Sequence, residues 1–141
     1  MSSKRQKIAV LIENCRGQDL DAHYLGYFQC FNKLLFYEAH EVLEELWLAD
    51  RHGPNYAFHK GLIQLAGAFV HLQKNRLPPA ASLLKLARTN LLKYPSTHDR
   101  LDIAQALALI AHWLHQLEAG HFKTNPLTPT NAPKLHLMAR K

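Results

Sequence analysis

Hydrophobic residues recur along this chain at the three- and four-residue spacing of amphipathic helices, and no segment alternates with the two-residue period of a strand. Gly, Pro and Asn interrupt the pattern and divide the chain into segments. The spacing predicts helices over residues 21–31, 35–48, 56–74, 78–94 and 100–119. Because the links after residue 31 are short, we expect an all-α fold, a compact bundle of about five helices with antiparallel sequential neighbours.

The two ends of the chain differ from this middle part. Residues 1–18 begin with basic residues, and the apolar run 8–12 behind them could pack on the bundle as an extra turn. Residues 121–141 contain three prolines and lack a helical period. We therefore expect a basic N-terminal segment (1–18), partly ordered or a short helix, a helical bundle domain (19–120) and a Pro-containing basic C-terminal tail (121–141).

Composition and charge narrow the class of protein. No apolar stretch approaches the roughly 18 residues of a membrane span, and residues 8–12 are too short for an export signal, so we expect a soluble, cytoplasmic protein without a membrane partner. Cys15 and Cys30 lack motif spacing and are expected to be free thiols. The net charge is +6, but residues 19–120 carry nine Lys or Arg against ten Asp or Glu. Since the basicity lies in the two ends, nucleic-acid binding is not expected.

The segment Phe36–Trp47 concentrates charge in a helix patterned for the core. At about 100° per residue, His40 and Glu44 fall one turn apart on one margin of its apolar face, and Glu38 falls on the opposite margin. An imidazole and a carboxylate at this spacing can share a divalent metal, with Glu41 as a candidate general base. Alternatively, His40 only satisfies hydrogen bonds at the core edge.

The next helix carries a narrow polar stripe on an otherwise apolar surface. Lys60, Gln64, Gly67 and His71 follow one another at spacings of four, three and four residues. If the stripe faces the preceding helix, Gln64 and His71 meet His40, Glu44 or Glu38. His40, Glu44 and His71 with water would then make a candidate zinc or manganese site, and a closed hydrogen-bond network of the same residues is an equal physical alternative.

Two motifs in order resemble the bacterial and archaeal domain-of-unknown-function family 309. They are YEAHEVLEELW at residues 37–47 and KGLIQLA at residues 60–66, the latter followed by His71. The resemblance covers about residues 20–118 and implies a compact helical bundle without a particular activity. One departure is Leu34, where relatives often have Gly. The positions that the resemblance implies as signature residues are Glu38, His40, Glu41, Glu44, Trp47, Gln64 and His71.

Two functions remain open at this level. In the first, helices two and three of the predicted bundle form a metal or small-ligand site, and the residues available to it are Glu38, His40, Glu41, Glu44, Trp47, Lys60, Gln64 and His71. In the second, the same cluster only fixes the packing of a noncatalytic interaction or structural protein, with a homo-oligomer as one form of it. His112 and His115 are expected to be solvated.

Overall fold

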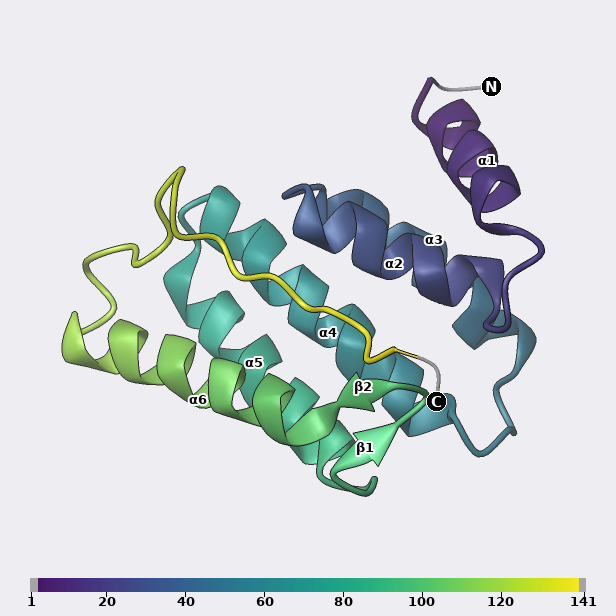
Figure 1. The fold of residues 1–141 in the computed structure, drawn as a ribbon. Helices are drawn as coiled ribbons and strands as arrows, with labels where there is room; N and C mark the ends of the chain where they lie inside the picture. Colours follow the sequence, from purple (N-terminus) through teal and green to yellow (C-terminus); the bar gives the residue numbers. More distant parts are fainter. Residues whose placement is uncertain (1–2, 140–141) are drawn as a thin grey trace.

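The computed structural model describes residues 3–139, and within them the chain forms six helices and one two-stranded hairpin (Figure 1). This confirms the predicted all-α bundle, and none of the described helices is long and apolar enough to cross a membrane. The elements are α1 (Ser3–Cys15), α2 (Ala22–Asn32), α3 (Phe36–Ala49), α4 (Tyr56–Gln73), α5 (Leu77–Leu91), β1 (Thr97–His98), β2 (Leu101–Asp102) and α6 (Ile103–Ala119).

Helix α4 forms the middle of the bundle, with α3 on one side and α5 on the other (Figure 1). Helix α2 packs on α3, and α6 packs on α5. A row of buried rings connects these layers: Phe36 of α3 lies 5.2 Å from Phe69 of α4, and Phe69 lies 5.0 Å from Trp113 of α6, measured between ring centroids. Such contacts join burial of large apolar surfaces with favourable ring geometry, and they hold α4 in a fixed position.

Two turns between helices use backbone conformations that the sequence pattern does not reveal. Leu34, between α2 and α3, has a φ of 65°, in the left-handed region that favours glycine. Asp99 and Arg100 have φ values of 47° and 62° in the turn of the hairpin. The predicted start of the last helix near residue 100 was therefore wrong: α6 begins at Ile103, and Asp102 caps it by accepting a hydrogen bond from the N–H of Gln105.

The N-terminal segment contains a helix of 13 residues, α1, so the described bundle has one helix more than the five expected. Ile8, Ile12 and Cys15 turn their side chains into the core. Helix α1 packs mainly on α2, at the edge of the molecule (Figure 1). The apolar run at residues 8–12 thus packs on the bundle, as the sequence pattern allowed, and it does so within a helix of 13 residues and not as a single extra turn.

Residues 121–139, which we call the C-terminal strap, form no helix but run along the bundle, as the yellow end of the chain in Figure 1 shows. Leu135 is buried, and the side chain of Asn32 at the end of α2 holds both of its backbone polar groups. Asn125 donates a hydrogen bond to the carbonyl of Leu72, at the end of α4. The part of the tail that the structure describes is therefore packed against the helices.

Candidate functional site

A groove of about 330 Å³ opens where α3, α4 and α5 meet. We call it the α4 groove, because α4 contributes most of its walls. Gln64 and the two histidines, His40 and His71, supply its main polar groups. Its complete lining consists of Tyr37, His40, Ile63, Gln64, Gly67, Val70, His71 and Leu83.

Helical spacing explains why these residues share the groove. Gln64, Gly67 and His71 lie on one stripe of α4, and Gly67 has no side chain to fill the space above it. A Cβ atom at Gly67 would lie 3.2 Å from Cδ1 of Leu83, so the glycine permits the close approach of α5. The stripe therefore faces both α3 and α5.

His40 is oriented by the carboxylate one turn along α3. Its Nε2 lies 3.3 Å from Oε2 of Glu44. This approach is an ion-pair distance without the geometry of a hydrogen bond, so either ring nitrogen can carry the proton of the neutral imidazole. The Nδ1 atom of His40 is buried and has no hydrogen-bond partner among the described residues.

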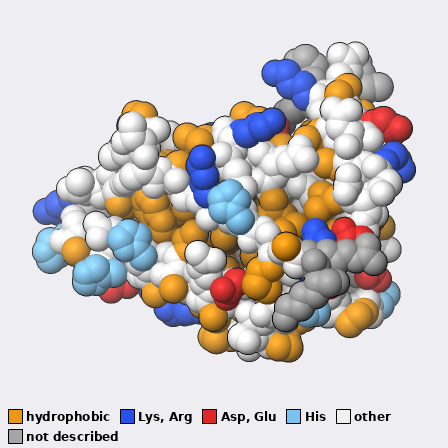
Figure 2. Space-filling model, in the orientation of Figure 1, with side chains coloured by type: hydrophobic (Ala, Val, Ile, Leu, Met, Phe, Trp, Pro, Cys, Tyr) orange, Lys and Arg blue, Asp and Glu red, His pale blue; other side chains and the backbone are white. Residues whose placement is uncertain are grey.

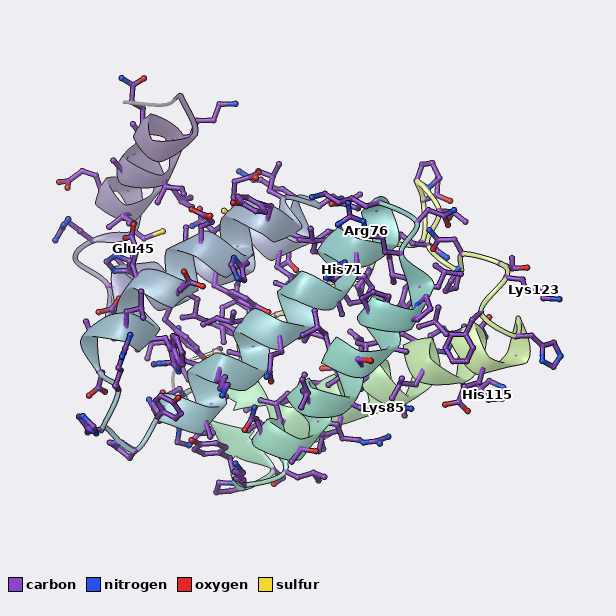
Figure 3. The ribbon with its side chains drawn as sticks, turned by 180° about the vertical axis from the view of Figure 1, so that it is seen from behind. Glu45, His71, Arg76, Lys85, His115 and Lys123 are labelled. Carbon is purple, nitrogen blue, oxygen red and sulfur yellow. The ribbon has the colours of Figure 1, made fainter. Side chains whose placement is uncertain are left out.

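His71 has a second nitrogen of the same kind. Its Nδ1 is also buried and has no partner within the described part of the chain. Burial lowers the pKa of His71, and the positive charges of Arg76 and Lys74 lower it further, so the ring is neutral at physiological pH. Figure 3 shows His71 near the end of α4, with Arg76 close by in the link to α5. A neutral imidazole offers one donor and one acceptor.

Gln64 is held in a defined orientation by a relay from α5. Nζ of Lys93 donates to Oδ1 of Asn90 at 3.2 Å, and Nδ2 of Asn90 donates to Oε1 of Gln64 at 2.8 Å. The Oε1 atom of Gln64 therefore accepts from Asn90, and its Nε2 group remains as a donor. Sequence reasoning missed Asn90 and Lys93. The available signal was a polar residue at position 90 beside Ala87 and Leu91, which are buried in α5.

The other predicted residues lie outside the α4 groove. Glu44 contacts the groove only through His40, and Glu38 lines a different, smaller cavity on the α1 side of α3. Trp47 packs against Tyr56 with ring centroids 5.2 Å apart and the rings tilted by 35°, and Nζ of Lys60 lies over the same tyrosine ring, 5.7 Å from its centroid. Glu41 is partly exposed. The residues of the predicted cluster therefore do not share one site: His40, Gln64 and His71 line the α4 groove, and the others lie elsewhere on α3 and α4.

The expected metal set of His40, Glu44 and His71 finds no support. Among residues 3–139, no group of three or more His, Cys, Asp or Glu side chains lies close enough to hold a metal ion. Cys15 and Cys30 are free and buried, as free thiols were expected to be, and burial raises the pKa of Cys30 to about 11. A thiol with so high a pKa is a poor nucleophile.

The face of the described residues that Figure 2 draws carries both charged side chains and histidines. His112 and His115 are exposed, as predicted, and Figure 2 shows histidines gathered toward the end of α6. On the face drawn in Figure 2, Lys and Arg side chains lie apart from one another. This face therefore lacks the continuous basic stripe that is typical of nucleic-acid binding.

Comparison with known proteins identifies one relationship. A family model described as a domain of unknown function matches residues 24–83. This range runs from α2 into α5 and includes every residue that lines the α4 groove, but not Asn90, Lys93 or the C-terminal strap. No curated protein matches the chain. No solved structure matches it.

Proposed function

We propose that the α4 groove, whose lining residues all lie within the match to the DUF309 family model, binds a small carboxylate with an apolar body. The observation that carries the proposal is the convergence of three uncommitted polar groups in one groove. They are the Nε2 donor of Gln64 and the two buried, unpartnered Nδ1 atoms of His40 and His71. Burying a polar atom without a partner costs about 1–3 kcal/mol, so a ligand that bonds to these atoms recovers that cost.

The charges around the groove favour an anionic group. Lys93 is connected to Gln64 by hydrogen bonds through Asn90, which places a positive charge on the α5 side of the groove. Arg76 and Lys74 are close enough to His71 to lower its pKa. The carboxylate of Glu44 on α3 is paired with Nε2 of His40 at 3.3 Å. A ligand carboxylate would accept from the Gln64 amide and from the Nδ1–H groups of His40 and His71.

The remaining walls suit an aliphatic chain. Ile63 and Val70 of α4 and Leu83 of α5 line the groove beside the polar groups. A volume of about 330 Å³ is near the lower end of the roughly 300–1,000 Å³ typical of small-molecule sites. This size fits a molecule of few carbon atoms.

The test is thermal unfolding of the full chain with hexanoate, inorganic phosphate, zinc or manganese added separately. A ligand at about 100 times its dissociation constant stabilises by about 2.7 kcal/mol. We expect hexanoate to raise the melting temperature, and we expect Gln64→Leu to abolish that rise. His112→Leu, at an exposed position on α6, is the control.

The other outcomes lead to different functions. Stabilisation by zinc or manganese that His40→Ala removes would favour the divalent-metal reading of the same residues. If no probe raises the melting temperature, small-ligand binding is refuted. The structural alternative would then be favoured, in which the protein is a noncatalytic interaction protein. In that case the hydrogen bonds from Lys93 through Asn90 to Gln64 serve only to hold α5 against α4.

A further inference from the structure

One contact in this chain shows a carboxamide side chain recognising an extended peptide backbone. Nδ2 of Asn32 donates to the carbonyl of Leu135 at 2.7 Å, and the N–H of Leu135 donates to Oδ1 of Asn32 at 2.8 Å. A single side chain thus satisfies both backbone groups of one strap residue. A neighbouring β-strand makes the same pair of bonds.

A cavity of about 330 Å³ lies directly beside this contact, away from the α4 groove. Four carboxamides line it from α1, α2 and the link between them, namely those of Asn14, Gln18, Gln29 and Asn32. Leu25 and Phe28 of α2 add apolar surface, and strap residues 135–137 form the opposite wall. The cavity is therefore bounded by α1, α2 and the strap.

The carboxamides of this cavity are available for a partner. The side chains of Asn14, Gln18 and Gln29 make no hydrogen bond to any described residue. The titratable side chains among the lining residues are those of Cys15 and His136, and no Asp, Glu, Lys or Arg is present there to pair with a charged group. A carboxamide offers both a donor pair and an acceptor, and a peptide bond requires both.

The wall formed by the strap has an unpaired backbone edge. The backbone N–H and C=O of Leu137 make no hydrogen bond within the described residues. In an extended chain, alternate residues direct their backbone groups to the same side. Leu137 therefore presents its groups toward the side on which Asn32 holds Leu135, where the cavity lies.

We propose that this cavity binds an uncharged, extended segment of another polypeptide, which adds beside strap residues 135–137. The segment pairs with the backbone of Leu137 as a strand would, and Gln18 and Gln29 bind its peptide groups from the opposite wall. One apolar side chain of the segment rests on Leu25 and Phe28. The two bonds between the Asn32 side chain and the Leu135 backbone show, within this chain, how a carboxamide binds a peptide group.

The experiment is a titration of the isotope-labelled full chain with acetyl-Thr-Leu-Thr-amide, followed by NMR. We expect saturable shifts of the Leu137 amide and of the side-chain amides of Gln18 and Gln29, with a dissociation constant of about 1 mM. The same peptide with an N-methylated leucine lacks the donor and should bind at least about five-fold more weakly. Gln29→Leu should weaken binding of the parent peptide.

The control variant is Gln116→Leu, an exposed glutamine on α6 outside the cavity, which should bind as the unchanged protein does. The proposal is overturned if the Leu137 amide shows no saturable shift up to about 20 mM peptide, or if the N-methylated peptide binds equally well. If the same amides shift when the protein concentration is raised without peptide, the cavity binds a second copy of this chain. That result would overturn the proposal that its partner is a different polypeptide.

Discussion

The two glycines of α4 that face α5 should respond in opposite ways to replacement by alanine. A Cβ atom at Gly61 would lie 3.1 Å from Cβ of Asn90 and 3.2 Å from two atoms of the Leu91 side chain. A Cβ atom at Gly67 would approach only Cδ1 of Leu83, at 3.2 Å. Cβ of Asn90 is fixed to the backbone, whereas Cδ1 of Leu83 is the end of a flexible side chain and can move aside.

The magnitudes follow from two opposing effects. Alanine is better than glycine in a helix interior by about 1 kcal/mol at either position. Overpacking a well-filled contact costs about 1–3 kcal/mol, and this cost applies fully at Gly61, where α5 itself has to shift. We therefore expect Gly61→Ala to destabilise by about 1 kcal/mol and Gly67→Ala to stabilise by about 0.5–1 kcal/mol.

Urea unfolding of both variants measures this difference, provided that the slope of the transition stays unchanged. The midpoint of Gly67→Ala should rise and that of Gly61→Ala should fall. Thermal unfolding should separate the two by about 5 °C, since 1 kcal/mol corresponds to about 3 °C for a chain of this size. Equal changes in the two variants would refute the reasoning, because helix propensity alone would then explain both.

Three further predictions concern other parts of the fold. Leu34→Gly should stabilise by about 1 kcal/mol in urea unfolding, because it relieves the left-handed backbone at φ 65°. Asn32→Ala should destabilise by about 1–3 kcal/mol and speed proteolysis within residues 121–139, since both groups of Leu135 lose their partner; unchanged proteolysis would contradict it. Burial lowers the pKa of His59 below its usual 6.5, so the unfolded chain binds a proton before the native one. Stability should therefore fall as the pH drops from about 6.5 through the folded pKa, and His59→Gln, measured in parallel melts, should flatten that fall.

The sequence pattern predicted α2 to α6, because each has an apolar face and Gly, Pro or Asn close to at least one of its ends. The stripe of Gln64, Gly67 and His71 likewise indicated which face of α4 a groove would use. Its neighbour His40 was found from its position on the margin of an apolar face. Helical periodicity is a local property of the sequence, so it is enough to place such residues on one face of a helix.

The remaining features depend on contacts between distant segments. Asn90 reaches Gln64 from α5, and nothing in the local sequence of either residue specifies that pair. Asn32 binds Leu135 across a separation of 103 residues. The strap has no helical periodicity from which its packing against the bundle could be predicted. The left-handed turn at Asp99 and Arg100 displaced the start of α6, because neither residue type by itself requires that conformation.

The bond between Asn32 and Leu135 also sets an order of events during synthesis. The ribosome makes α2 about a hundred residues before the strap, and domains begin to pack while the chain is still growing. We expect α2 to α6 to assemble first, with the Asn32 carboxamide exposed to water until Leu135 arrives. A translational pause shortly before residue 133 would extend the life of this open form and the time in which a chaperone can bind it.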